Sequence, residues 1–117
     1  MDLEAIRDYC LSFPHATEDL KWGHDLCFCI GGKMFAVVGL DLASPSRLSF
    51  KCTPEEFAEL TERDGVVPAP YVARYHWVAL ERFDALGKSE IKRLIKGSYE
   101  MVFAKLPKKV KAQLTHR

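Results

Sequence analysis

The stretch LCFCIGGKMFAVVGL, residues 26–40, decides the fold. Two runs of apolar, strand-favouring residues flank the pair Gly31-Gly32. A two-residue Gly-Gly turn supplies the positive φ angles that a type I′ hairpin needs. Strand alternation then places Leu26 and Phe28 on one face of the first strand and Cys27 on the other. The stretch therefore predicts an antiparallel hairpin with one face in the core.

Three other segments have the pattern of helices. Residues 2–13 and residues 89–106 each carry apolar side chains at helical spacing until a proline follows. A third helix begins after Thr53, whose hydroxyl can cap the chain while Glu56, three residues later, bonds back to it. The basic residues from about 107 onward are expected to project from the last helix as a tail.

Further strands complete the expected fold. Residues 47–52 alternate apolar and polar side chains, and residues 76–83 are rich in strand-favouring types. Residues 66–75 contain prolines, which suit an irregular segment or an edge strand. The expected order is α-β-β-β-α-β(β)-α. It predicts one α+β domain over residues 1–117, with a mainly antiparallel sheet packed by helices.

The composition is that of a globular domain. The 117 residues are 48% hydrophobic and 28% charged, a balance that disfavours disorder. The longest apolar run, at residues 34–40, is far shorter than the ~20 residues of a membrane-spanning helix. The acidic start of the chain lacks signal-peptide character. We therefore expect a cytoplasmic protein with no membrane partner, whose four cysteines are reduced thiols.

Residue types that bind metals or catalyse reactions are present without a matching pattern. His24, Cys27 and Cys29 are soft ligands at short spacing, but no second ligand pair accompanies them. The thiols and histidines also lack a known Cys–His signature, and no Gly-x-Ser-x-Gly elbow occurs. Cysteines on a strand suit a packed sheet face. We therefore expect no metal site, no cofactor and no catalytic residue.

Charge is distributed unevenly along the chain. Residues 88–117 hold nine Lys or Arg against two Glu, a net charge of +7, whereas residues 1–87 carry a net charge of −6. Cations near a helix C-terminus are favoured by the helix dipole without any ligand. The four lysines between Lys105 and Lys111 exceed what that effect requires. The asymmetry indicates an anionic partner.

A second basic segment contains aromatic residues. Arg74, Tyr75, His76 and Trp77 are consecutive, and cations beside large rings suit phosphate contact and base stacking. Trp77 equally suits the core, where tryptophan is usually buried, and His76 would then face the other way. The nucleic-acid contacts predicted from sequence are Lys33, Arg47, Lys51, Arg74, His76, Lys105, Lys108, Lys109 and Lys111.

Four stretches resemble the MmcQ/YjbR-like family of small bacterial proteins. They are GGKMFAVV (31–38), LSFKC (48–52) before a proline and a helix, HWVAL (76–80) and SYEMVFAKLPKK (98–109). The resemblance implies a compact fold related to secretion-chaperone-like domains. It also implies the family's usual label, predicted DNA-binding protein, and it brings no catalytic residues.

The resemblance also implies a set of signature positions. The family often has two basic residues before its His-Trp pair, whereas Arg74-Tyr75 stands there in this chain. Weaker phosphate binding, or stacking by Tyr75, would follow. The remaining signature positions are Gly32, Lys33, Met34, Phe35, Lys51, His76, Trp77 and 106–109.

Three functions fit the sequence. The first is a non-enzymatic, weakly sequence-specific DNA-binding domain, which basic residues gathered on one face would favour. The alternative is a protein-interaction or chaperone-like module, monomeric or homodimeric, which a broad apolar patch on an exposed sheet face would favour. The third is a small-ligand pocket lined by Trp22, Trp77 and the cysteines, which a deep pocket holding Trp77, His76 and His24 would favour.

Overall fold

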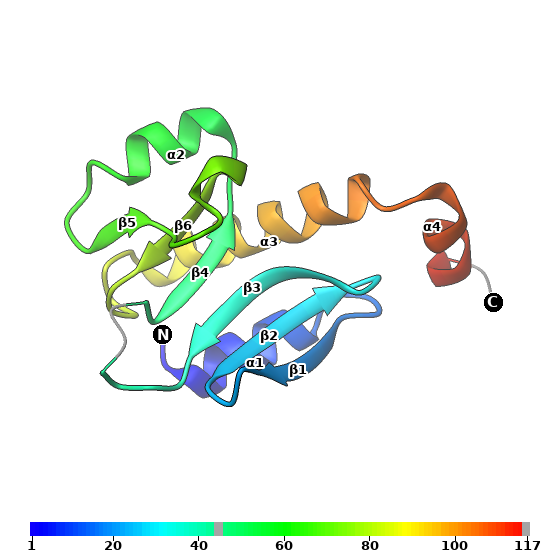
Figure 1. The fold of residues 1–117 in the computed structure, drawn as a ribbon, viewed down its shortest axis with the longest axis horizontal. Coiled ribbons are helices and arrows are strands. Elements are labelled where there is room, and N and C mark those ends of the chain that lie inside the picture. The colour runs from blue at the N-terminus through cyan, green and yellow to red at the C-terminus, as the bar shows by residue number, and fades with distance from the viewer. Residues whose placement is uncertain (44–45, 116–117) are drawn as a thin grey trace.

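A six-stranded antiparallel sheet runs through the molecule in the order β1-β2-β3-β4-β6-β5 (Figure 1). The computed structural model describes residues 1–43 and 46–115. The elements along the chain are α1 (Leu3–Leu11), β1 (Thr17–Lys21), β2 (Asp25–Ile30), β3 (Lys33–Gly39), β4 (Leu48–Lys51), α2 (Pro54–Leu60), β5 (Val66–Pro68), the 3-10 helix η1 (Ala73–Tyr75), β6 (Trp77–Leu80), α3 (Lys88–Ala104) and α4 (Lys108–Thr115).

The β2–β3 hairpin forms as the sequence predicts. Its turn residues Gly31 and Gly32 have φ angles of +58° and +80°, both in the left-handed region that glycine adopts without strain. The register shifts by one residue beside Phe28, so that Phe35 and Ala36 both pack in the core under the helices. The bulge adds one residue to β3, so these two consecutive side chains both face the core.

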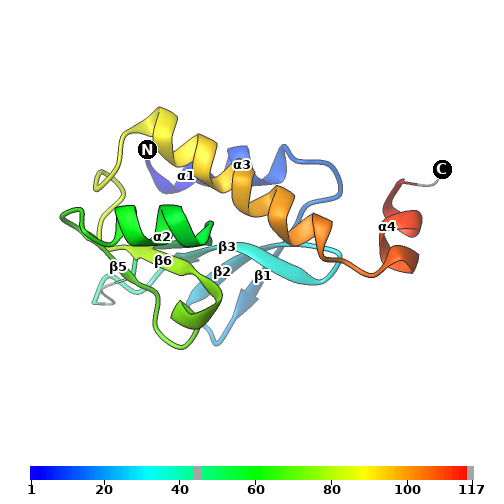
Figure 2. The same ribbon diagram turned by 90° about the horizontal axis from the view of Figure 1, so that it is seen from above.

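The two faces of the sheet differ in what covers them. Helices α1, α2 and α3 all lie on one face (Figure 2), and they enclose the main core, whose largest buried side chains include Phe28, Phe35 and Phe50. We call the other face the open face. One row of side chains crosses it from strand to strand, and its members are Asp19, Cys27, Val37, Ser49, Ala79 and Val67.

Helix α3 is joined to the sheet by a buried hydroxyl group. The β3–β4 ladder ends at the pair of Ala36 with Phe50, so Phe35 and Lys51 lie where the strands separate. Ser98 is fully buried at this point. Its Oγ donates to the carbonyl of Phe35 at 2.6 Å and accepts from the backbone N–H of Lys51 at 3.0 Å. The hydroxyl thus takes the place of a ladder bond.

Most of the predicted elements are confirmed. The α+β class and the antiparallel sheet are as expected, and Thr53 and Glu56 form both hydrogen bonds of the capping box. β5 is the expected edge strand, next to β6 alone. α3 is amphipathic, as predicted, and in the part of the chain that the structure describes no helix is long and apolar enough to cross a membrane.

Two elements differ from the expectation. The sequence of the connector before the hairpin, residues 15–25, allows a short strand around residues 20–22, whereas the structure has the five-residue strand β1 (Thr17–Lys21). The segment from about 107, expected to be a tail, forms the helix α4. Pro107 ends α3 but also opens α4, because a proline at a helix start loses no intrahelical hydrogen bond. Lys111 donates its backbone N–H to the Pro107 carbonyl at 3.0 Å, which begins the new helix.

The packing of α4 on the hairpin can be tested at the two turn glycines. An added Cβ at Gly31 would lie 2.7 Å from Leu106 Cδ1 and 3.0 Å from Val110 Cγ1, whereas one at Gly32 would meet nothing within 4 Å. We expect Gly32→Ala to destabilise by about 1 kcal/mol, from backbone strain alone. Gly31→Ala should cost about 1 kcal/mol more, through the additional clash. Urea unfolding of both variants measures the difference, and equal effects would show that α4 does not pack there.

Candidate functional site

Seven of the nine predicted nucleic-acid contacts lie at the β2–β3 turn, the end of β4, η1, the end of α3 and α4. Figure 1 shows the β2–β3 turn and α4 together at one end of the molecule, with the end of β4 and the η1 segment nearer its middle, beside α2. We call this cluster the basic end. The β2–β3 turn lies against the α3–α4 junction through contacts of Gly31 with Leu106 and Val110. The members of the basic end are Lys33, Lys51, Arg74, Lys105, Lys108, Lys109 and Lys111.

Lys51, the last residue of β4, lies beside η1 and near Lys105. Its Nζ donates to the carbonyl of Tyr75 at 2.6 Å. Burial, and after it the positive charge of Lys105, lowers the pKa of the Lys51 ammonium. Beside it, the Arg74 guanidinium lies 4.8 Å from the centroid of the Tyr75 ring, and its Nη2 donates to the Tyr75 hydroxyl at 2.7 Å. An anion near Lys51 and Lys105 would relieve the repulsion between them.

The lysines of α4 have different roles. Lys111 Nζ donates to the carbonyl of Ala104 at 2.6 Å, at the C-terminal end of α3, which is the dipole-favoured position that the sequence suggested for the whole group. Lys108 and Lys109 are instead the first two residues of α4. A helix N-terminus disfavours cations and attracts anions. Helix stability therefore does not explain these two lysines.

The ion pairs of the described residues are all formed by arginines or a histidine outside the basic end, and Lys21, Lys88, Lys92 and Lys96 are as unpaired as the cations of the basic end. Arg7 pairs with Glu18 at 2.6 Å, Arg63 with Glu90 at 2.7 Å and Arg93 with Glu56 at 3.2 Å, and Arg82 has two aspartate partners. Over residues 1–43 and 46–115, none of the seven cations of the basic end forms an ion pair with a carboxylate. Their charge is therefore available to an anionic ligand.

The remaining two predicted contacts lie elsewhere. Arg47 precedes β4, at the end of that strand opposite to Lys51, and its guanidinium lies 4.9 Å from the centroid of the Phe83 ring. Its Nη1 is buried and has no hydrogen-bond partner among the described residues. The ring of His76 packs edge-on against Phe57 of α2, with centroids 5.7 Å apart. Neither side chain joins the basic end in this arrangement.

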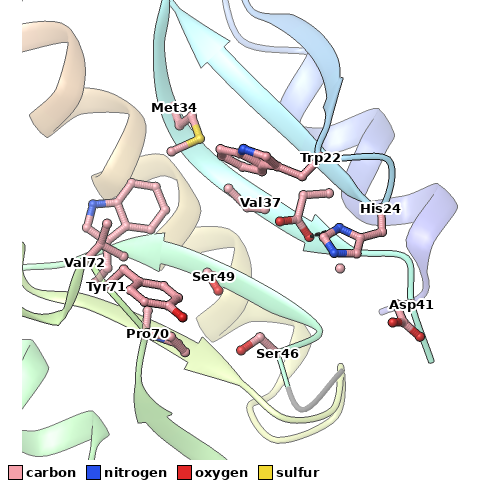
Figure 3. A pocket seen from close by; sticks show the side chains of 14 residues that line it. Trp22, His24, Met34, Val37, Asp41, Ser46, Ser49, Pro70, Tyr71 and Val72 are labelled. Atoms are coloured by element: carbon pink, nitrogen blue, oxygen red, sulfur yellow. Dashed lines mark ion pairs between the residues drawn. The ribbon is translucent and has the colours of Figure 1, made fainter. Parts of the chain in front are cut away.

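A groove lies on the open face (Figure 3), and the sequence predicted only some of the residues that line it. The groove has a volume of about 740 Å³, within the range of small-ligand sites. Trp77 is 7% exposed and packs in the smaller apolar cluster of this face. The groove contains Trp22, Trp77 and His24, as the small-ligand hypothesis expects, but its lining includes neither His76 nor a cysteine. Its main apolar residues are Trp22, Met34, Val37, Tyr71, Val72 and Trp77.

The four cysteines are buried and none of them forms a disulfide. Burial raises the pKa of Cys10 to about 12 and is the main cause that raises those of Cys27 and Cys52 to about 11. Thiols with such pKa values remain protonated near neutral pH and are poor nucleophiles. In the described part of the chain, no three His, Cys, Asp or Glu side chains are grouped so as to hold a metal ion.

The fold and the order of its elements define a class of small α+β domains in which helices cover one face of an antiparallel sheet. The model of the YjbR family matches residues 11–101, which is most of the chain. The chain therefore belongs to the YjbR family. This result confirms the family resemblance seen in the sequence.

Two solved structures are similar over most of their length. The Deinococcus radiodurans protein DR2400, with a DUF419 domain, is 26% identical at a TM-score of 0.83, and the match covers 96% of this chain and 86% of that one. A Pseudomonas syringae protein is 21% identical at a TM-score of 0.73, with 87% and 99% covered, and shows the fold alone. No curated protein matches this chain.

Proposed function

We propose that this protein is a non-enzymatic DNA-binding domain with little sequence preference, and that it contacts the phosphate backbone through the basic end. The observation that carries the proposal is the position of Lys108 and Lys109 at the start of α4, where helix stability disfavours them. The mutual repulsion of Lys51 and Lys105, which a bound anion would relieve, supports it further.

The basic end offers separate groups to successive phosphates. One phosphate is held by Lys108, Lys109 and the free backbone N–H groups of the α4 N-terminus, and a second by Lys51 and Lys105. Contacts of this kind fix position on a nucleic acid without reading its sequence. The Tyr75 ring, 49% exposed beneath a guanidinium, is available to stack on an unpaired base.

Two other features bear on the proposal. The buried, protonated thiols support a role without covalent catalysis. The alternative of a protein-interaction module needs a broad exposed sheet face, and a groove indents that face here. We therefore propose no second function of that kind. A cytoplasmic location and a monomeric or homodimeric state stay predictions.

Anisotropy titrations with fluorescein-labelled single-stranded and duplex 20-mers test the proposal. We expect binding at 50 mM salt that weakens as salt rises, because phosphate contacts release condensed counterions. With three to six contacts, the slope of log K against log salt should lie at roughly −3 to −5 for the duplex. Tighter binding to the single strand, abolished in Tyr75→Ala, would assign the stacking role to Tyr75. No binding to either DNA at 50 mM salt would refute the proposed function.

A further inference from the structure

We propose that the groove on the open face is a binding site for a flat aromatic organic cation. The proposal is independent of DNA binding, because the groove and the basic end share no residue. It depends on three observations: the arrangement of the aromatic walls, the backbone strain at those walls, and the charge of the lining.

The groove has a floor of one apolar and one hydroxyl side chain, and two aromatic walls. Val37 and Ser49 form the floor, and the Trp22 and Tyr71 rings rise on opposite sides of it (Figure 3). Trp77 packs with Ala69 and Val72, which flank Pro70 and Tyr71 in sequence, and is largely buried. A flat ring system placed above Val37 would contact π-faces on both sides, an arrangement that aromatic ligands favour.

The two wall residues are held in costly conformations. Trp22 has φ +55°, followed by Gly23 at +76°, and His24 N–H donates to the Lys21 carbonyl at 3.3 Å. This is a turn in which both central residues have positive φ, so Asn or Gly is preferred at the first of them. Tyr71, directly after Pro70, has φ +68°, a region that bulky residues rarely adopt.

The backbone strain of the two wall residues is not offset by burial of their side chains. Trp22 is 69% exposed and Tyr71 is 99% exposed, so each combines backbone strain with an apolar surface left in water. In the free protein these two features only lower stability. A ligand held between the two rings would give both residues a role, and strain of this kind is concentrated at binding sites.

The charged side chains that line the groove favour a cationic ligand. Among the described residues, its lining includes Asp25 and Asp41 and contains no Lys or Arg. The Asp25 carboxylate lies 3.6 Å from His24 Nδ1, and Lys21 stands opposite Asp25 in the β1–β2 ladder without lining the groove. Lys51 stands opposite Trp77, but its ammonium is bound to the Tyr75 carbonyl. Carboxylates and aromatic faces together attract a cation, whereas a phosphate or carboxylate ligand would be repelled.

Three probes with one ring system test this selection. They are 1-naphthylmethylammonium, 1-naphthalenemethanol and 1-naphthoate, which are cationic, neutral and anionic. Calorimetry should give saturable binding of the cation, at least tenfold tighter than the alcohol, and no saturable binding of the anion. In ¹H–¹⁵N spectra the cation should shift the indole N–H signals of Trp22 and Trp77 and leave the amides of α4 unchanged.

Matched variants locate the site. Tyr71→Ala should weaken binding of the cation at least fivefold, while Tyr75→Ala, an exposed tyrosine outside the groove, should change it less than twofold. Asp25→Asn with Asp41→Asn should reduce the preference for the cation over the alcohol to less than threefold. Asn keeps the shape of Asp, and at position 41 it keeps an acceptor for the Ala43 N–H.

Several results would overturn the proposal. These are no binding of any probe at 5 mM, equal binding of cation and anion, or a cation site that Tyr71→Ala leaves intact. A dimer in sedimentation velocity that Trp22→Ala converts to monomer would also overturn it, because a second copy would then cover the groove. DNA binding at the basic end is measured separately, so either proposal can fail while the other holds.

Discussion

Replacing Ser98 with alanine is expected to lower the free energy of unfolding by about 2–4 kcal/mol, because the buried carbonyl of Phe35 and the part-buried N–H of Lys51 lose their partner. The Ser98 hydroxyl accepts from the Lys51 N–H and donates to the Phe35 carbonyl, at the point where β3 and β4 separate. Ser98 is fully buried, so bulk water does not replace the hydroxyl there. Urea unfolding followed by circular dichroism measures the decrease in stability.

A control on the same helix separates this effect from helix propensity. Ser89 is an exposed residue in the first turn of α3, and it can be replaced by alanine in the same way as Ser98. Ser89→Ala should change stability by less than about 0.5 kcal/mol, as surface substitutions usually do. If Ser98→Ala were equally mild, the hydroxyl bridge would not be what joins α3 to the strand fork.

Charge reversal at the start of α4 is expected to weaken DNA binding strongly. Lys108→Glu with Lys109→Glu should lower affinity at 50 mM salt by roughly 10- to 100-fold and reduce the salt slope by about 1, for the one phosphate that is no longer bound. The helix itself should not suffer, because carboxylates in a first turn are favoured by the dipole. Anisotropy measures the affinity, and thermal unfolding checks that the melting temperature is kept.

The matched control is Lys88→Glu with Lys96→Glu. It changes the net charge by the same amount, but both lysines are exposed residues of α3 outside the basic end. We expect less than a threefold decrease in affinity, because only a general change in charge remains. Equal decreases in the two double variants would mean that binding reflects net charge, and that α4 has no specific role.

Local sequence signals were sufficient where a short pattern determines the structure by itself. The pair Gly31-Gly32 allows the positive φ angles of the hairpin turn, and Thr53 with Glu56 forms the capping box of α2. In both cases the residues that make the element lie within a few positions of one another. The structure confirms these predictions because no distant contact competes with them.

Elements that depend on distant partners were harder to predict. β1 is mostly exposed, and its five residues form a strand because β2 offers them a free edge. α4 has few apolar residues, and its contact with Gly31 of the hairpin is set by the three-dimensional fold. A proline read as the end of one helix is also the start of the next.

The candidate sites divide in the same way. The lysines of the basic end could be identified from their density in sequence, but Arg47 lies at the other end of β4 against Phe83. The sequence predicted a pocket with Trp22, Trp77 and His24 but not the part of Tyr71, which lies opposite Trp22 across the sheet. The available signals were two large aromatic residues beside turn-forming residues, namely Trp22 before Gly23 and Tyr71 after Pro70.

The central claim is that DNA binds at the basic end, and chemical-shift mapping tests it most directly. An unlabelled 12-nucleotide single strand is added to ¹⁵N-labelled protein at 50 mM salt, and the amide signals are followed. We predict that the largest shifts occur at residues 31–34, 50–52, 74–76 and 104–111, with the region around Trp22 unchanged. Shifts centred on Trp22 and Tyr71, or no shifts at any concentration, would contradict the claim.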